Sequence, residues 1–230
     1  MGWYFDPSYL IFMLPGLLLS MLAQWYVSST FRRFSEVPLS TGLSGAEVAA
    51  ALLRGAGVGG VSVEEVDGFL TDHYDPSAKV LRLSPAVYRS RSVSAAGVAA
   101  HEAGHAIQHA ERWGLMPVRQ ALVLPARLGS QLAFFAIILG LSLHLLGLAW
   151  LGVVLFAFLL LFELVTLPIE VNASTRARGR LLDGGLIAPA DADGISRVLR
   201  AAAFTYVASL VTTALQLLYF VLRIRRASER

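Results

Sequence analysis

The chain has no cysteine and few charged residues. The absence of cysteine excludes disulfide bonds and thiolate metal sites, so any metal ion here has to be held by histidine and carboxylate side chains. Charged residues make up 15% of the 230 residues, whereas soluble domains usually contain about 25%. Lysine is almost absent as well, because Lys79 is the only lysine among 19 cationic residues. This composition argues against an ordinary soluble protein.

The chain also lacks the features of a nucleic-acid-binding protein. Its formal net charge is only +3, and the arginines are spread through predicted loops instead of forming a basic block. No groove-like pattern of arginine and aromatic residues is present. We therefore expect no nucleic-acid partner, and we interpret the arginines as membrane-flanking and solvated charges.

Long apolar runs dominate what is present, with 56% hydrophobic residues and a mean hydropathy of +0.61. The first run, Tyr9–Val27, has no basic segment before it and is too long for a signal peptide, so it predicts an uncleaved transmembrane helix. The run Leu122–Leu167 is too long for one span and predicts two helices with a turn near Leu146–Trp150. A fourth span is predicted at Ala201–Leu222. The fold class expected is a mainly α membrane protein with about four transmembrane helices.

The segment between the first two runs, about residues 28–119, has the character of a soluble part. Ser44 is a suitable N-cap for a helix over 45–57, and residues 61–63 predict a short strand. The stretch Phe69–Leu83 predicts a β-hairpin, because Asp75-Pro76-Ser77 favours a turn. A long helix is expected over 92–113, where apolar residues recur at helical spacing.

These patterns predict five regions. They are an N-terminal transmembrane helix (1–28), a soluble part with a long helix and a small β-hairpin (29–120), a transmembrane helical hairpin (121–167), a helix and polar segment (168–200), and an apolar helix with a basic tail (201–230). Pro168 is expected to end or kink the third transmembrane helix.

The motif His101-Glu102-Ala103-Gly104-His105 falls inside the predicted long helix. Residues four apart lie on one face of a helix, so both imidazoles point the same way and can bind one zinc ion. Glu102 lies beside that face, where it can take a proton from a metal-bound water. The motif therefore predicts a zinc-dependent hydrolase with His101 and His105 as metal ligands and Glu102 as the catalytic base.

A catalytic zinc usually has three protein ligands and one open position, so a third ligand is needed. A continuous helix cannot easily bring His109 or Glu111 round the same ion, and His144 lies deep in an apolar run. Glu163 stands in an apolar span, where an ionisable residue is a functional candidate by default. The candidates are His73, His109, Glu111, His144, Glu163 and Glu170.

The segment Glu170-Val171-Asn172-Ala173-Ser174 resembles the E-x-x-A-D pattern of zincins whose third ligand is a glutamate. That resemblance favours Glu170 as the third ligand. Ser174 stands where those proteins have an acid that orients a ligand histidine, so a weaker hydrogen bond from Ser174 is expected.

Three further blocks extend the likeness, namely Thr71–Pro76, Leu83–Pro85 and Val98–Gln108. Together with Pro168–Ala177 and Thr205–Ala208 they resemble, in the right order, the neutral zinc metallopeptidases of bacterial membranes (the YugP-like family). The layout is more distantly similar to HtpX-type and CAAX prenyl proteases. The resemblance implies a multi-pass protein of the bacterial inner (plasma) membrane that uses Zn²⁺ to cleave a peptide or a membrane protein.

Other parts of a mechanism are left open by the sequence. The possible donors to the oxyanion of the tetrahedral intermediate are His73, Tyr74, Arg176, Arg178 and Tyr206. Either Lys79–Leu83 or Gly68–Thr71 could pair with an extended substrate as an edge strand. Two other functions compete: a non-catalytic membrane scaffold or chaperone-like protein that retains zinc, and a transporter that uses Glu163. The intact Glu102 counts against the scaffold, and the lack of repeats counts against the transporter.

The distribution of arginines predicts the orientation in the bilayer. Arg32 and Arg33 follow the first span, and five arginines lie between the third and fourth, which places the catalytic side in the cytoplasm. The tail with Arg223, Arg225, Arg226 and Arg230 then falls outside, against the rule. That conflict would disappear if Ala201–Leu222 packed against the catalytic part instead of crossing the membrane.

Overall fold

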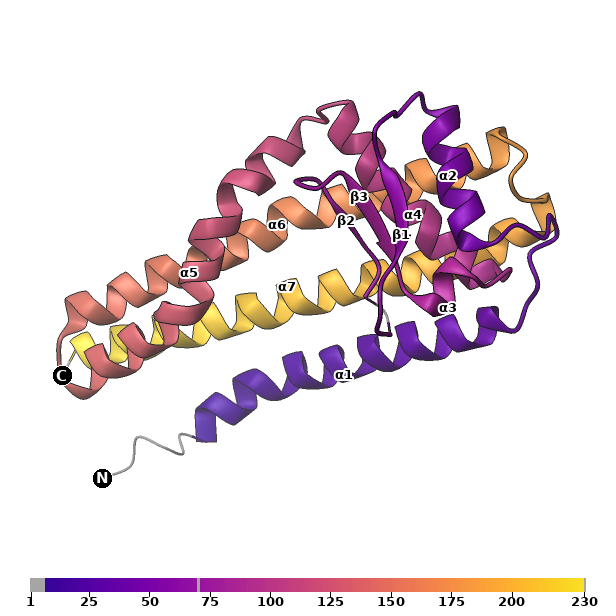
Figure 1. Ribbon diagram of the computed structural model, residues 1–230. Coiled ribbons are helices and arrows are strands. Elements are labelled where there is room, and N and C mark those ends of the chain that lie inside the picture. The colour runs from indigo at the N-terminus through magenta and orange to yellow at the C-terminus, as the bar shows by residue number, and fades with distance from the viewer. Residues whose placement is uncertain (1–6, 70, 230) are drawn as a thin grey trace. The chain divides into compact units, whose positions relative to one another are not determined.

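The computed structural model describes residues 7–69 and 71–229 (Figure 1). Residues 1–6 of the predicted N-terminal segment, Leu70 of the predicted hairpin and Arg230 of the predicted tail lie outside the described residues. The elements, in chain order, are α1 (Pro7–Ser35), α2 (Gly45–Gly55), β1 (Ser62–Glu65), β2 (His73–Asp75), β3 (Val80–Leu83), α3 (Pro85–Tyr88), α4 (Val93–Ala110), α5 (Leu115–Ser142), α6 (Leu146–Asp183), the 3₁₀ turn η1 (Pro189–Asp191) and α7 (Ala192–Ser228).

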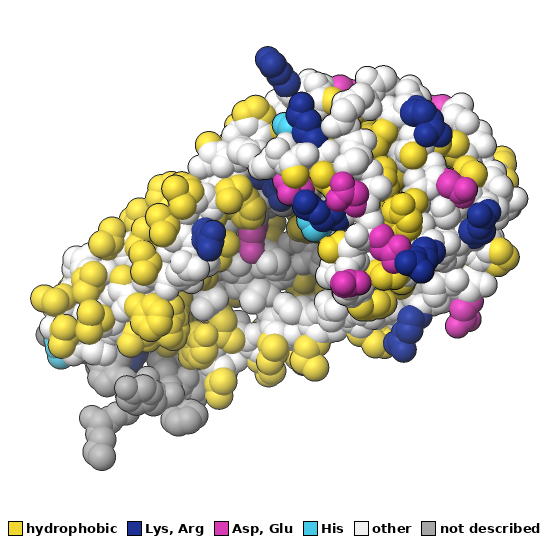
Figure 2. All heavy atoms as spheres, viewed as in Figure 1, with side chains coloured by type: hydrophobic (Ala, Val, Ile, Leu, Met, Phe, Trp, Pro, Cys, Tyr) yellow, Lys and Arg dark blue, Asp and Glu magenta, His cyan; other side chains and the backbone are white. Residues whose placement is uncertain are grey.

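The chain forms two compact units. We call the first the membrane unit; it comprises Met1–Gln24, Pro117–Pro168 and Phe204–Arg230. The second carries the predicted catalytic residues and is called the catalytic unit for that reason; it comprises Trp25–Met116 and Ile169–Ala203. Hydrophobic side chains cover the visible surface of the membrane unit, whereas charged side chains gather over the catalytic unit (Figure 2).

Four helices are long and apolar enough to cross a membrane, namely those within Tyr9–Ser35, Leu115–Ser142, Leu146–Asp183 and Pro189–Ser228. Within the membrane unit, Thr212 of α7 donates a hydrogen bond to the Gly16 carbonyl of α1 (3.1 Å). A Cβ atom on Gly16 would lie only 2.9 Å from the Thr212 hydroxyl oxygen, so the small residue permits this close approach. The prediction of a mainly α membrane protein with about four spans is confirmed.

One local prediction about the third span is wrong. The turn after α5 lies at residues 143–145, before the predicted position, and His144 adopts a positive φ of 58° there. His144 therefore occupies a turn and not the interior of an apolar run. Of the two outcomes predicted for Pro168, an end or a kink, the helix end does not occur, because α6 continues to Asp183. A proline removes only one backbone donor, and membrane helices tolerate that loss.

The helix that follows Ser44 begins where the sequence predicts. The Ser44 hydroxyl accepts from the Glu47 amide (3.2 Å), and the Glu47 carboxylate accepts from the Ser44 amide (2.7 Å). This reciprocal capping box satisfies two backbone donors that a helix start otherwise leaves unpaired. The amphipathic helix α2 then buries Val48, Ala49 and Leu52 against the core of the catalytic unit.

The strands form a three-stranded sheet of order β1-β3-β2. β2 and β3 are the predicted antiparallel hairpin, with Tyr74 opposite Leu81. β1 pairs with β3 in parallel, with Val63 opposite Leu81. The strand Val80–Leu83 is therefore central and paired on both sides, so it cannot accept a substrate strand as the sequence suggested. The edge strand that contacts α4 is β2.

The long predicted helix is α4, and it runs through the core of the catalytic unit. Ser92 caps its start by accepting from the Ala95 amide (3.2 Å). Most of its buried residues are alanine, glycine or serine, which let neighbouring helices approach closely. On the side of α6, a Cβ atom on Gly104 would lie 2.8 Å from the Ala173 carbonyl oxygen.

Candidate metal centre

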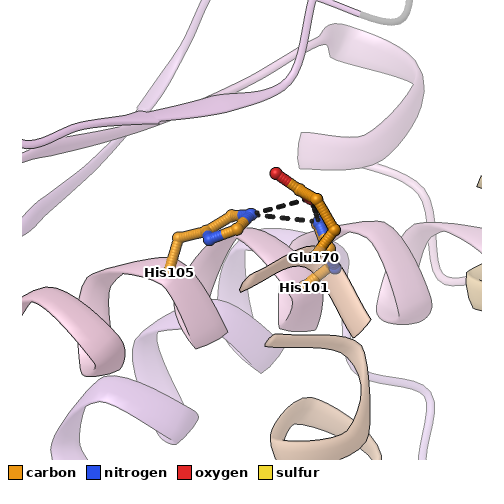
Figure 3. Close-up of side chains that lie close together, drawn as sticks. All are labelled: His101, His105 and Glu170. Atoms are coloured by element: carbon orange, nitrogen blue, oxygen red, sulfur yellow. Dashed lines mark hydrogen bonds and ion pairs between the residues drawn. The ribbon is translucent and has the colours of Figure 1, made fainter. Parts of the chain in front are cut away.

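Three side chains from α4 and α6 converge in the catalytic unit, as Figure 3 shows. His101 and His105 lie one turn apart on α4, so their imidazoles share a face. Glu170 comes from α6 and is nearly inaccessible, with 3% of its side chain exposed, against 13% for His101 and 14% for His105. The site is thus largely buried, and each histidine is somewhat more exposed than the glutamate.

The donor atoms form a nearly equilateral triangle. The Nε2 atoms of His101 and His105 lie 3.1 and 3.2 Å from the Glu170 Oε2 atom, and 3.2 Å from each other. Tetrahedral zinc with ligands at about 2.0–2.1 Å has neighbouring donors roughly 3.3 Å apart. Two imidazole nitrogens and one carboxylate oxygen are also the donor set of many catalytic zinc sites. The residues therefore fit a zinc ion in both chemistry and spacing.

Each histidine has a partner on its other ring nitrogen. The His101 Nδ1 atom lies 3.1 Å from the Ser174 hydroxyl, and the His105 Nδ1 atom lies 3.0 Å from the Gln108 Oε1 atom. Such contacts orient a ligand imidazole toward the metal. Ser174 thus lies where the sequence pattern suggested. Gln108 was missed, although its position three residues after His105 places it on the same helix face.

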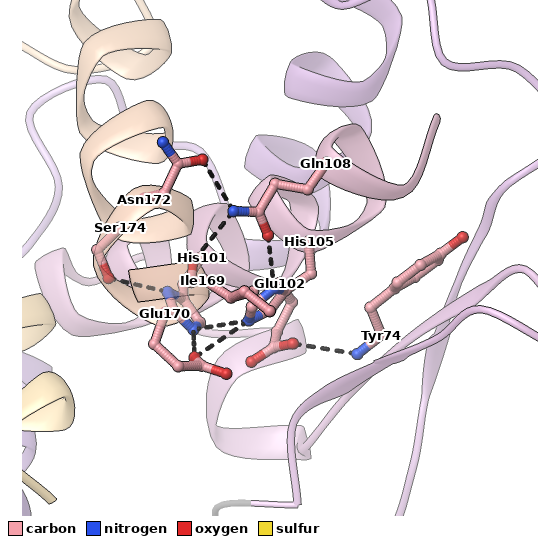
Figure 4. A network of polar contacts seen from close by, with 9 residues as sticks. All are labelled: Tyr74, His101, Glu102, His105, Gln108, Ile169, Glu170, Asn172 and Ser174. Carbon is pink, nitrogen blue, oxygen red and sulfur yellow. Dashed lines mark hydrogen bonds and ion pairs between the residues drawn. The ribbon is translucent and has the colours of Figure 1, made fainter. Parts of the chain in front are cut away.

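Glu102 is held by the edge strand. The Tyr74 backbone amide donates to the Glu102 Oε2 atom (3.0 Å), and the Tyr74 side chain points away from it, as Figure 4 shows. The Tyr74 hydroxyl instead contacts the Nδ1 atom of His109 (2.9 Å). These two contacts fix β2 against α4 and orient the carboxylate. The sequence could not indicate the role of a backbone amide.

The surroundings shift the pKa values of two ionisable groups on α4. Loss of water around the Glu102 carboxylate raises its pKa, although the two neighbouring histidines oppose the shift. Burial by itself would lower the pKa of His105, but the hydrogen bond and charge of Glu170 outweigh it, so this pKa is raised. A carboxylate with a raised pKa is a better proton acceptor near neutral pH.

The other candidate ligands lie elsewhere. Glu111 forms ion pairs with Arg176 and, at 3.1 Å, with Arg180, and these pairs tie the end of α4 to α6. His73 is exposed, and its Nδ1 atom contacts the Thr71 carbonyl (2.7 Å). Arg176 is thus engaged away from the triangle. Among the described residues, the group of histidine and carboxylate side chains able to hold a metal is His101, His105 and Glu170.

Three predicted candidates belong to the membrane unit. Glu163 accepts a hydrogen bond from the Ser209 hydroxyl (2.7 Å). His144 lies in the turn between α5 and α6. Tyr206 lies on α7, in the part assigned to the same unit.

Comparison with known proteins agrees with this chemistry. Over residues 9–225 the chain matches the family described as "Putative neutral zinc metallopeptidase". It is 43% identical over 209 residues to the "Putative membrane protease YugP" of Bacillus subtilis (strain 168), and the alignment covers 91% of this chain and 93% of that protein. No solved structure matches the chain.

Proposed function

The chain belongs to the family of neutral zinc metallopeptidases, and on this premise we propose that it is a membrane-embedded, zinc-dependent endopeptidase. The observation that carries the proposal is the triangle of His101, His105 and Glu170 donors with the Glu102 carboxylate on the same helix. A scaffold that kept zinc only for structure would not need a carboxylate base beside the metal ligands.

The residues have separate tasks in this mechanism. Zinc bound by His101, His105 and Glu170 would act as a Lewis acid and bring the pKa of a bound water toward about 7. Glu102 takes the proton of the attacking water and later passes it to the departing amine. The Tyr74 amide engages Oε2 of Glu102, so we assign the proton transfer to Oε1.

The substrate is a peptide in extended conformation. β2 is the edge strand beside α4, and an exposed strand edge can pair with an added strand through backbone hydrogen bonds. We propose that a peptide or a segment of a membrane protein pairs along β2, which brings its scissile bond near Glu102. This replaces both predicted edges: Lys79–Leu83 contains the central strand, and the described residues of Gly68–Thr71 lie outside the strands.

The orientation follows the arginine distribution. We propose that the protein resides in the bacterial inner membrane with the catalytic unit in the cytoplasm. Most of α7 belongs to Phe204–Arg230, a segment of the membrane unit. In this proposal α7 therefore crosses the bilayer, and the basic tail lies outside the cell. The arginines that follow the first and third spans then determine the orientation in the bilayer, against the effect of those in the tail.

The test uses full-length protein purified in detergent. We expect about one zinc per chain in the wild type, loss of zinc in His105→Ala and weakened binding in Glu170→Gln. Glu102→Gln should keep zinc and lower cleavage of unfolded casein by about 10²–10⁴-fold. Glu36→Gln, an exposed carboxylate outside the site, serves as the matched control. Absence of zinc in metal-replete wild type would overturn the proposal, and full activity in Glu102→Gln would overturn the assigned base.

A further inference from the structure

Gln108 is completely buried, with 0% of its surface exposed, and its side chain makes three hydrogen bonds. Its Oε1 atom contacts the His105 Nδ1 atom (3.0 Å). Its Nε2 atom donates to the Ile169 carbonyl (3.0 Å) and to the Asn172 Oδ1 atom (2.9 Å). Figure 4 shows this amide lying between α4 and the segment of α6 that carries Glu170.

The orientation of the Gln108 amide follows from chemistry. The Ile169 carbonyl oxygen can only accept a hydrogen bond, so the Gln108 atom that faces it has to be the NH₂ group. The oxygen of the amide is then the atom that faces His105. Because an amide oxygen is only an acceptor, the Nδ1 atom of His105 has to carry a proton.

This proton determines what the other ring nitrogen can do. In a neutral imidazole one nitrogen carries hydrogen and the other holds a free lone pair. With hydrogen on Nδ1, the lone pair of His105 is on Nε2, the atom that faces His101 and Glu170 at 3.2 Å. The Glu170 Oε2 atom is also an acceptor and competes for the single hydrogen of the neutral ring. The Gln108 oxygen is the contact that favours hydrogen on Nδ1, which is the tautomer that a metal ligand requires.

Ser174 cannot do the same for His101. Its hydroxyl can either donate or accept, so the 3.1 Å contact with the His101 Nδ1 atom is compatible with both tautomers. The two ligand histidines thus differ, since one has its tautomer determined by its partner and the other does not.

From this network we propose that Gln108 is the positioning residue of the metal centre. It presets the metal-binding tautomer of His105 and, through Ile169, ties that ring to the backbone next to Glu170. The two ligand helices are thereby assembled around the site before zinc binds. The purpose of this arrangement rests on the proposed zinc-dependent function, but the tautomer itself does not.

The experiment measures the metal-free, full-length protein in detergent by ¹⁵N NMR of its histidine rings, at a pH of about 9 where imidazole is neutral. His105→Ala identifies the His105 signals. In the wild type we expect His105 to carry its hydrogen on Nδ1. Hydrogen on Nε2 would overturn the proposal, and this result does not depend on zinc binding.

The variant Gln108→Leu tests the consequence. We expect a mixture of His105 tautomers and a zinc dissociation constant raised about 10–100-fold, with Gln120→Leu, an exposed glutamine on α5, as the control. Asn172→Ala removes one of the three contacts and should preserve the tautomer. Unchanged tautomer and affinity in folded Gln108→Leu would overturn the proposal. Zinc-free wild type with the Nδ1–H tautomer would instead defeat the proposed function and leave the tautomer assignment standing.

Discussion

Gly104, inside the histidine motif, faces the backbone carbonyl of Ala173 so closely that a Cβ atom would lie 2.8 Å from that oxygen. The close approach brings α4 near enough to α6 for both histidines to reach Glu170. A backbone carbonyl cannot rotate away as a long side chain can, so any added methyl group has to push the helices apart.

We therefore predict that Gly104→Ala lowers the free energy of unfolding by about 1–3 kcal/mol. It should also weaken zinc binding about tenfold or more, although Gly104 has no side chain that could bind the metal. Gly97→Ala is the matched control on the same helix, because its nearest neighbours would be side-chain atoms of Val198 and Ile195 at 3.6–3.8 Å. Thermal unfolding and chelator competition measure both effects. Equal behaviour of the two variants would contradict the prediction.

Ser174→Asp should strengthen the metal site. An aspartate there would only accept hydrogen bonds, so it would keep hydrogen on the His101 Nδ1 atom and leave Nε2 free for the metal. We expect zinc binding to tighten about tenfold, measured by competition with a chelator of known affinity. Ser174→Ala should bind no tighter than the wild type. Weaker binding by Ser174→Asp would show that the position does not tolerate a second carboxylate near Glu170.

Zinc affinity should rise with pH through the titration of His105. Because Glu170 raises the pKa of His105, the metal-free protein keeps the proton of this ring to a higher pH than the usual value of about 6.5. The charged ring stabilises the metal-free fold below that value, and the contribution is lost as pH rises through the raised pKa. Zinc competes with the same proton. Competition titrations from about pH 5 to about pH 9 should show this dependence, and an affinity that is flat above about pH 6 would contradict it.

The absence of cysteine makes the membrane orientation directly measurable. We predict that Gly59→Cys in the catalytic unit reacts with a membrane-impermeant maleimide only after the cells are opened. Ser228→Cys in the tail should react in intact cells. Both positions are exposed in the structure. Labelling of both residues from the same side would show that α7 does not cross the bilayer, and the reverse pattern would place the catalytic unit outside.

Much of this protein follows from local sequence patterns. The apolar runs determine four helices long and apolar enough to cross a membrane, because that property needs only length and hydrophobicity. Ser44 and Glu47 determine a helix start through contacts three residues apart. The spacing of His101 and His105 places both rings on one face, since helix geometry repeats every 3.6 residues.

Tertiary structure decided the rest, because the remaining contacts join residues that are distant in the chain. The resemblance favoured Glu170 among six candidates for the third ligand, but only the packing of α4 against α6 brings it to His105, which lies 65 residues earlier in the chain. The same packing brings the Gln108 amide to the Ile169 carbonyl, and the pairing of β1 with β3 leaves β2 as the edge strand that holds Glu102. Local periodicity determines which face a side chain occupies, whereas its partner depends on which segments pack together.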